Sequence, residues 1–260
     1  MRRHLMAGNW KLYNVTTEEC EKEAKGIAEA AKDADCEVVL CPPFPFLPIV
    51  RKAIEGTNVK LGAQGVFWEE RGGFTSQVSP LSLKDLGCEY VIIGHSETRG
   101  RFGVGSVKEE FLSYFSESDE TVNLKVLAAL KVGLKPIICV GETISERKAG
   151  RQDEVVSYQV ERALANVGDI EGVVIAYEPV WAIGTGEFCD PDEANRIIGL
   201  IRNKVRELFG DKAEEMRILY GGSVDPGNIK SFMEKEEIDG ALVGRASAKA
   251  ESFGKIIKYR

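Results

Sequence analysis

Eight short apolar runs recur along the chain, separated by stretches of mixed polarity. Most of them do not alternate apolar with polar residues, which is typical of strands covered on both faces, as in a parallel sheet wrapped by helices. We therefore predict eight strands with helical segments between them. The runs span residues 5–7, 38–40, 59–61, 91–93, 137–139, 173–175, 218–220 and 241–243.

Residues with helix-capping chemistry stand between these runs. Thr16 and Glu19 form a capping-box pattern, and Ser79, Asp190 and Asp225 each precede a proline, which pairs an N-cap acceptor with proline at the first helical position. Strands that alternate with helices indicate either a closed (β/α)8 barrel or an open doubly wound sheet. The glycine-rich patterns of nucleotide-binding sheets do not occur, which favours an α/β fold with a closed, parallel, eight-stranded barrel in one domain.

The composition narrows the class of protein and its partners. With 260 residues, 43% hydrophobic and 29% charged, the chain matches an ordinary globular domain and not a disordered one. Its net charge of −7 would repel nucleic acid and anionic membranes, so we expect neither as a partner, and an anionic substrate would need a local positive pocket. No apolar stretch approaches a membrane helix or a secretory signal, and six scattered cysteines without a C-x-x-C pattern indicate a reducing cytoplasm.

Polar residues follow the apolar runs at the points where strands should end. In a parallel barrel all strand C-termini open on one face, so these residues, although distant in sequence, would converge there. The sequence thus predicts a pocket shared by a base, an electrophile and a cation. The residues are Asn9, Lys11, His95, Glu97, Glu142, Glu178, Ser223, Gly244 and Arg245.

Three of them carry specific chemistry. Glu178 directly follows an apolar strand, where a carboxylate is costly to desolvate unless it is paired or protonated, and a raised pKa suits a general base. His4 and His95 are the only histidines, which excludes a multi-histidine metal site and leaves His95 as a structural residue or a catalyst. Lys11 is either a solvated surface lysine or part of the pocket. The glycine-containing turns after the last two strands are typical of phosphate sites in barrel enzymes.

Six segments carry a resemblance to a known family. Taken in order, they cover essentially the whole chain, and on them the sequence resembles the triosephosphate isomerase family, whose members have the (β/α)8 TIM barrel fold. The longest segment is highly specific by itself. The segments are GNWK (8–11), IGHSE (93–97), CVGE (139–142), AYEPVWAIGTG (176–186), YGGSV (220–224) and LVG (242–244).

The resemblance implies an isomerase that interconverts dihydroxyacetone phosphate and D-glyceraldehyde 3-phosphate in glycolysis and gluconeogenesis, through an enediolate and with no cofactor or metal. In this family, a reference case for pKa tuning, Glu178 would move the proton between neighbouring carbons, and His95 would polarise the carbonyl as a neutral imidazole whose pKa a helix N-terminus depresses. Lys11 would offset negative charge, Asn9 would donate a hydrogen bond, and Glu97 would orient the neighbouring cation.

The resemblance also implies a phosphate site, a lid and a dimer. Phosphate would rest on Asn9, Lys11 and the backbone N–H groups of Gly184, Ser223, Gly244 and Arg245. Closure of the lid would exclude water from the enediolate. A homodimer would form through an arm that contains Gly73, Phe74 and Thr75. The lid would comprise Pro179, Val180, Trp181, Ala182, Ile183, Gly184, Thr185 and Gly186.

Arg245 departs from the family, which usually has a second glycine after the eighth strand. A backbone N–H survives the change, so phosphate contact is still expected. If the position needs a positive φ, arginine would be strained there, and its side chain must either avoid the pocket or join it. The sequence predicts weakened or altered phosphate affinity at most.

Two other departures concern the loops. The interval from His95 to Glu178 is longer than the family's, which predicts that residues 1–260 form one barrel with an inserted segment near 100–113 in the fourth βα loop, a glycine-rich stretch followed by a short amphipathic helix. In addition, three residues of the third and fourth loops differ from the usual Gly, Glu and Arg, which predicts an altered dimer interface. They are Ser76, Gln77 and Thr98.

The residues by themselves leave two alternative functions open. A barrel aldolase would use Lys11 as a Schiff-base nucleophile, which requires a lysine that is neutral near pH 7. A catalytically silent barrel would bind a sugar phosphate or a protein, although it has no physical need of a desolvated base such as Glu178.

Overall fold

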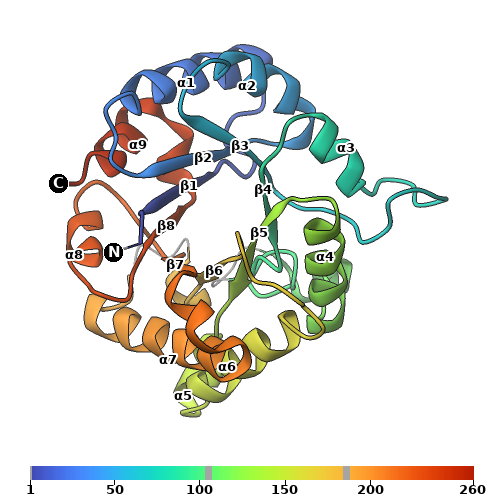
Figure 1. Cartoon of the computed structure of the whole chain (residues 1–260), viewed down its shortest axis with the longest axis vertical. Coiled ribbons are helices and arrows are strands. Elements are labelled where there is room, and N and C mark those ends of the chain that lie inside the picture. Colours follow the sequence, from blue (N-terminus) through green and yellow to red (C-terminus); the bar gives the residue numbers. More distant parts are fainter. Residues whose placement is uncertain (1, 103–106, 184–187) are drawn as a thin grey trace.

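The computed structural model of the chain describes residues 2–102, 107–183 and 188–260. Eight parallel strands form a closed barrel in chain order, with β8 pairing back onto β1 (Figure 1). The eight predicted strands and the closed barrel are confirmed. The strands are β1 (Leu5–Asn9), β2 (Glu37–Cys41), β3 (Val59–Ala63), β4 (Tyr90–Ile93), β5 (Lys135–Val140), β6 (Val174–Tyr177), β7 (Arg217–Tyr220) and β8 (Gly240–Val243).

Helices follow the strands and surround the barrel (Figure 1). In the described residues, the α-helices are α1 (Thr17–Ala30), α2 (Leu47–Ala53), α3 (Pro80–Asp85), α4 (Asp119–Lys131), α5 (Ile144–Lys148), α6 (Gln152–Ala163), α7 (Pro191–Phe209), α8 (Ile229–Met233) and α9 (Ala250–Ile257). Short 3-10 helices are η1 (Phe44–Phe46), η2 (Glu109–Tyr114), η3 (Val180–Ala182), η4 (Gly210–Glu214) and η5 (Arg245–Ala248). No helix in the described ranges is long and apolar enough to span a bilayer.

Three of the four predicted helix starts are confirmed. Thr16 caps α1 in a reciprocal capping box with Glu19, and Ser79 and Asp190 cap α3 and α7. The start predicted at Asp225 is wrong, because α8 begins only at Ile229. The Asp225 carboxylate instead accepts the N–H groups of residues 227 and 228, which closes a turn before the helix.

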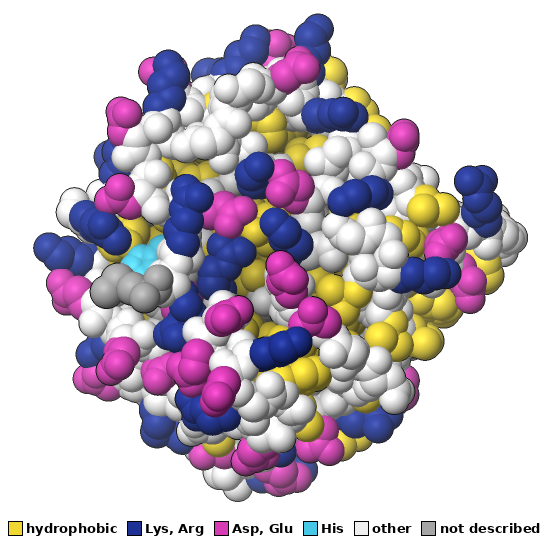
Figure 2. All heavy atoms as spheres, in the orientation of Figure 1, with side chains coloured by type: hydrophobic (Ala, Val, Ile, Leu, Met, Phe, Trp, Pro, Cys, Tyr) yellow, Lys and Arg dark blue, Asp and Glu magenta, His cyan; other side chains and the backbone are white. Residues whose placement is uncertain are grey.

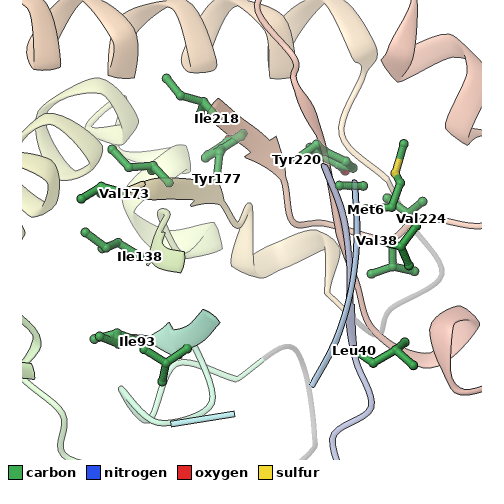
Figure 3. Packing of buried hydrophobic residues seen from close by; sticks show 14 of the residues in the cluster. Met6, Val38, Leu40, Ile93, Ile138, Val173, Tyr177, Ile218, Tyr220 and Val224 are labelled. Atoms are coloured by element: carbon green, nitrogen blue, oxygen red, sulfur yellow. The ribbon is translucent and has the colours of Figure 1, made fainter. Parts of the chain in front are cut away.

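Alternate residues of each strand face opposite sides of the barrel wall and form two separate apolar clusters. The inner cluster fills the barrel and includes Leu5, Val39 and Leu219. The outer cluster includes Met6, Val38 and Ile218, and its members lie between the strands and the surrounding helices (Figure 3). The same alternation decides which residue beyond the end of each strand points into the barrel, and so it places the side chains of the site.

A cluster of charged and phenolic side chains closes the barrel at the N-terminal ends of its strands. Arg217, the first residue of β7, binds Glu37 of β2 with an Nη1–Oε2 distance of 2.6 Å and donates to the Tyr90 hydroxyl at 2.8 Å. That hydroxyl donates to the other oxygen of Glu37 at 2.9 Å. Burial alone would raise the pKa of Glu37, but Arg217 and Tyr90 outweigh it and lower the pKa. Elsewhere, charges of both signs are interspersed over the molecular face in Figure 2.

We predict that Glu37→Gln lowers the free energy of unfolding at pH 7 by about 1–3 kcal/mol, because Arg217 loses its charged partner in a mostly buried site. Since folding lowers the pKa of Glu37, its contribution is present above the carboxyl's ordinary pKa and is lost as the pH falls through the lowered value. Urea unfolding at pH 7 and in acid should therefore show a gap between wild type and variant that narrows in acid. Equal unfolding free energies at pH 7 would contradict the prediction.

Candidate active site

The C-terminal ends of the strands bring most of the predicted site residues around one cavity of about 310 Å³. Asn9 and Glu178 occupy the inward-facing positions in the alternation of β1 and β6, and they are 5% and 2% exposed. The distant strand ends therefore converge as predicted. The predicted residues that line the cavity are Asn9, Lys11, His95, Glu178, Ile183, Ser223, Gly244 and Arg245.

Glu178 lies between two groups that can donate hydrogen bonds. Its Oε2 accepts the backbone N–H of Ser96 at 3.0 Å, and its Oε1 lies 3.1 Å from Nε2 of His95. The His95 Nδ1 accepts the backbone N–H of Glu97 at 3.2 Å, so that nitrogen carries no proton and the proton of a neutral ring is on Nε2. The Nε2–H of a neutral His95 thus lies close to the Glu178 carboxylate, whose Oε1 accepts no hydrogen bond from the described residues.

No helix begins directly after His95 in the described residues, so the helix N-terminus that the resemblance implies beside this ring is not formed by the residues that follow it. The residues that follow form turns, in which the His95 carbonyl accepts the N–H groups of Thr98 at 2.9 Å and Arg99 at 3.2 Å. Thr98 also donates its hydroxyl to the Glu117 carboxylate, at 2.5 Å. A single turn of this kind carries fewer aligned peptide dipoles than a helix.

Lys11 is held in place by three contacts. Its ammonium lies 2.7 Å from Glu97 Oε1, its N–H donates to Asn9 Oδ1 at 3.1 Å, and its carbonyl accepts from Gln64 Nε2 at 3.0 Å. These contacts support a backbone with φ of 44°, which non-glycine residues rarely adopt and which recurs at functional sites. Burial would raise the pKa of Glu97, but the charges of His95 and Lys11 and the hydrogen bond from Lys11 lower it, so Glu97 stays ionised.

The turns after β7 and β8 form the other wall of the cavity. A Cβ at Gly221 would lie 2.9 Å from Cγ of Glu178, so glycine there leaves room for the carboxylate. A Cβ at Gly244 would lie 3.6 Å from Cε of Lys11, which places the end of that lysine beside the turn. Backbone strain was expected at Arg245 only if the position required a positive φ. Arg245 begins η5 and does not have a positive φ, so it is not strained.

The described part of the predicted lid is anchored to a buried carboxylate. Glu142, fully buried, accepts from Nε1 of Trp181 at 2.8 Å and from Nε of Arg147 at 2.9 Å, while its backbone carbonyl accepts the N–H of Val180 at 3.1 Å. Ser223 donates its hydroxyl to the Ala182 carbonyl at 2.5 Å. Residues 184–186 of the predicted lid, with the phosphate ligand predicted at Gly184, lie outside the described residues.

The described residues of the predicted arm and of the inserted segment do not line the cavity. Phe74 of the arm is 44% exposed, and Ser76 has a φ of 71°, a conformation that suits the glycine of the family pattern. In the segment near 100–113, the helix is the 3-10 helix η2, which exposes Phe111 and Tyr114. Its glycine-rich part, 103–106, lies outside the described residues.

Several residues of the site were not assigned a role from sequence. Ser96 acts through its backbone N–H, which every residue type has, so no side-chain signal could reveal it. Gln64 follows β3 at a position that faces into the barrel. The alternation of side chains along that strand could therefore have identified it as a site residue. Burial and the adjacent Glu178 carboxylate raise the pKa of the Cys139 thiol well above its ordinary value, so this buried thiol stays protonated beside the carboxylate.

Within the described residues, no group of three or more His, Cys, Asp or Glu side chains could hold a metal ion. Fold and cavity define the class, which is that of (β/α)8-barrel enzymes with a site at the C-terminal ends of the strands. Comparison with known proteins narrows this class. A family model described as triosephosphate isomerase matches residues 4–260.

Individual relatives agree with the family match. The triosephosphate isomerase of Caldanaerobacter subterraneus subsp. tengcongensis is 52% identical over 262 aligned residues, covering 100% of both chains. That of Clostridium tetani is 49% identical, covering 100% of this chain and 98% of the other. The crystal structure of triosephosphate isomerase from Bartonella henselae has a TM-score of 0.87 at 35% identity, covering 99% and 98%. The chain belongs to the triosephosphate isomerase family and is an isomerase.

Proposed function

We propose that the chain interconverts dihydroxyacetone phosphate and D-glyceraldehyde 3-phosphate, with Glu178 as the base. The observation that carries this proposal is the placement of a 2%-exposed carboxylate 3.1 Å from His95 Nε2, on a cavity that also holds Lys11. The relatives named above are triosephosphate isomerases, which supports the same substrates.

Each residue has a part in the reaction. Glu178 takes a proton from C1 of dihydroxyacetone phosphate, and the electron pair of that C–H bond forms the C1–C2 double bond while negative charge develops on the carbonyl oxygen. The Nε2–H of His95 and the Lys11 ammonium stabilise this charge, and Asn9 adds a hydrogen bond. Glu178 then returns the proton to C2, and His95 moves the hydroxyl hydrogen from the C1 oxygen to the C2 oxygen. The product is the aldehyde, and no redox partner or cofactor is consumed.

The surrounding residues support binding and closure. Glu97 orients the Lys11 ammonium through the 2.7 Å contact. Backbone N–H groups of Gly184, Ser223, Gly244 and Arg245 receive the phosphate. We propose that residues 179–186 form a lid whose closure excludes water from the enediolate, with Trp181 and its contact to Glu142 at the hinge.

The mechanism is tested by isomerisation in D2O. Dihydroxyacetone phosphate converted by the enzyme should yield glyceraldehyde 3-phosphate with deuterium at C2, because the proton held by Glu178 exchanges with solvent before it returns. Absence of isomerase activity would refute the function, and full retention of the substrate hydrogen would refute transfer through an exchangeable base. Borohydride trapping tests the aldolase alternative, which the Lys11–Glu97 ion pair disfavours because a Schiff-base lysine must be neutral.

We propose a cytoplasmic homodimer that acts in glycolysis and gluconeogenesis, with residues 100–113 as an insertion in the fourth loop. The six cysteines are free and buried, which suits a reducing compartment. Leu12, Val15 and Phe74, on the loops after β1 and β3, are 77%, 55% and 44% exposed, and such apolar exposure favours a partner surface.

Sedimentation at micromolar concentration tests the dimer. The expected result is twice the chain mass of 28.6 kDa. Deletion of the arm tip, residues 73–75, should give a monomer, because it removes Phe74 from the proposed contact. A wild-type chain that sediments as a monomer would contradict the assembly without affecting the fold.

A further inference from the structure

The charges around the cavity do not match the charge of a phosphorylated substrate unless Arg245 takes part. Lys11 is already paired with Glu97 at 2.7 Å. Glu178 and Asp225 also line the cavity, and both are carboxylates. The protein as a whole carries a formal charge of −7, which opposes the approach of an anion. Without another cation, the cavity would present more negative than positive charge to a phosphate dianion.

Arg245 is the cation that restores this balance. It lines the same cavity, is exposed, and forms no ion pair or side-chain hydrogen bond with any residue that the structure describes. Asp225, the other exposed charge on the wall, uses its Oδ1 to accept the N–H groups of residues 227 and 228. The guanidinium is therefore available to a ligand.

The position of Arg245 in the chain indicates that it would act on the phosphate group of the substrate. It directly follows Gly244, whose neighbour is the end of Lys11, and it shares the cavity wall with Ser223. Its backbone lacks a positive φ, so the arginine adds a side chain here without strain. A planar guanidinium binds two phosphate oxygens at once.

We propose that the Arg245 side chain is an additional phosphate-binding group that strengthens substrate binding. This proposal rests on the proposed function and concerns binding, not the proton-transfer step. Since the guanidinium is exposed and solvated, the expected gain is modest: Arg245→Gln should raise KM and the inhibition constant for inorganic phosphate about three- to tenfold, with kcat nearly unchanged. The ratio should shrink at high ionic strength because salt screens exposed charges.

Lys22→Gln provides the matched control, because Lys22 is an exposed cation on α1 that does not line the cavity. It removes one positive charge from the protein without touching the site, so its constants should equal those of the wild type. Arg245→Gly should behave like Arg245→Gln, because the position needs no special backbone conformation. Arg245→Lys should recover part of the affinity.

The inhibition constants are checked by calorimetric titration with inorganic phosphate, which does not depend on turnover. If the wild type fails to isomerise triose phosphates, the proposed function fails, while calorimetry still decides the role of Arg245. Phosphate affinity of Arg245→Gln equal to that of Lys22→Gln would overturn the inference. So would a fall in kcat at unchanged KM, or a difference that does not diminish with salt.

Discussion

Glu178→Gln should lower kcat about a hundred- to ten-thousandfold, the usual contribution of a positioned general base, with a much smaller change in KM. The amide cannot accept the substrate proton. The Ser96 N–H donates to the Glu178 carboxylate, and the amide oxygen of glutamine can accept the same hydrogen bond. The measurement is a coupled assay on glyceraldehyde 3-phosphate.

The control for this substitution is Glu234→Gln, which removes an exposed carboxylate that does not line the cavity. It should retain full activity. Thermal unfolding of both variants shows whether Glu178→Gln is folded, and Glu178→Asp keeps the base but shortens its reach, so its activity should lie between the wild type and the amide. Equal rates for the wild type and Glu178→Gln would exclude Glu178 as the base.

Asp239→Ala should lower the free energy of unfolding by about 3–5 kcal/mol, because it leaves a buried guanidinium with one charged partner fewer. Arg202 of α7 is 2% exposed and lies 2.8 Å from Asp239 Oδ2. The same oxygen accepts the N–H of Ile218 at 2.9 Å, and Arg2 lies 2.6 Å from Oδ1. From its place directly before β8, the Asp239 carboxylate thus connects the segment before β1 with α7 and β7. Urea unfolding measures the loss.

Asp35→Ala is the matched control, since Asp35 forms an ion pair with Arg260 in which both side chains are more than half exposed. Exposed pairs contribute little, so the expected change is much smaller than that of Asp239→Ala. Similar losses for Asp35→Ala and Asp239→Ala would show that burial of the Arg202–Asp239 pair does not decide its contribution.

The sequence predicted the strands because their cause is local. Fully buried parallel strands need continuous apolar runs, and helix starts such as Thr16 and Asp190 need specific capping side chains, so both leave a signal in adjacent residues. The candidate site could also be located, because residues such as His95 and Glu178 immediately follow predicted strands. The barrel topology then determines that these strand ends meet.

The contacts inside the site could not be predicted in the same way. The pairing of Lys11 with Glu97 joins residues from different strand ends, and the contact of Trp181 with Glu142 depends on side-chain conformations that no local pattern encodes. The start predicted at Asp225 failed because its carboxylate can cap a turn as well as a helix. Tertiary contacts decide between such alternatives.

The pairing of β1 with β8 has a consequence for biosynthesis. Leu5 pairs with Gly240, so one edge of β1 has no partner until β8 has left the ribosome. The nascent chain therefore exposes an unprotected strand edge throughout translation, when it is most prone to aggregate. The native ring closes only once β8 has been synthesised, and the yield of active protein should depend on chaperones that shield the growing chain.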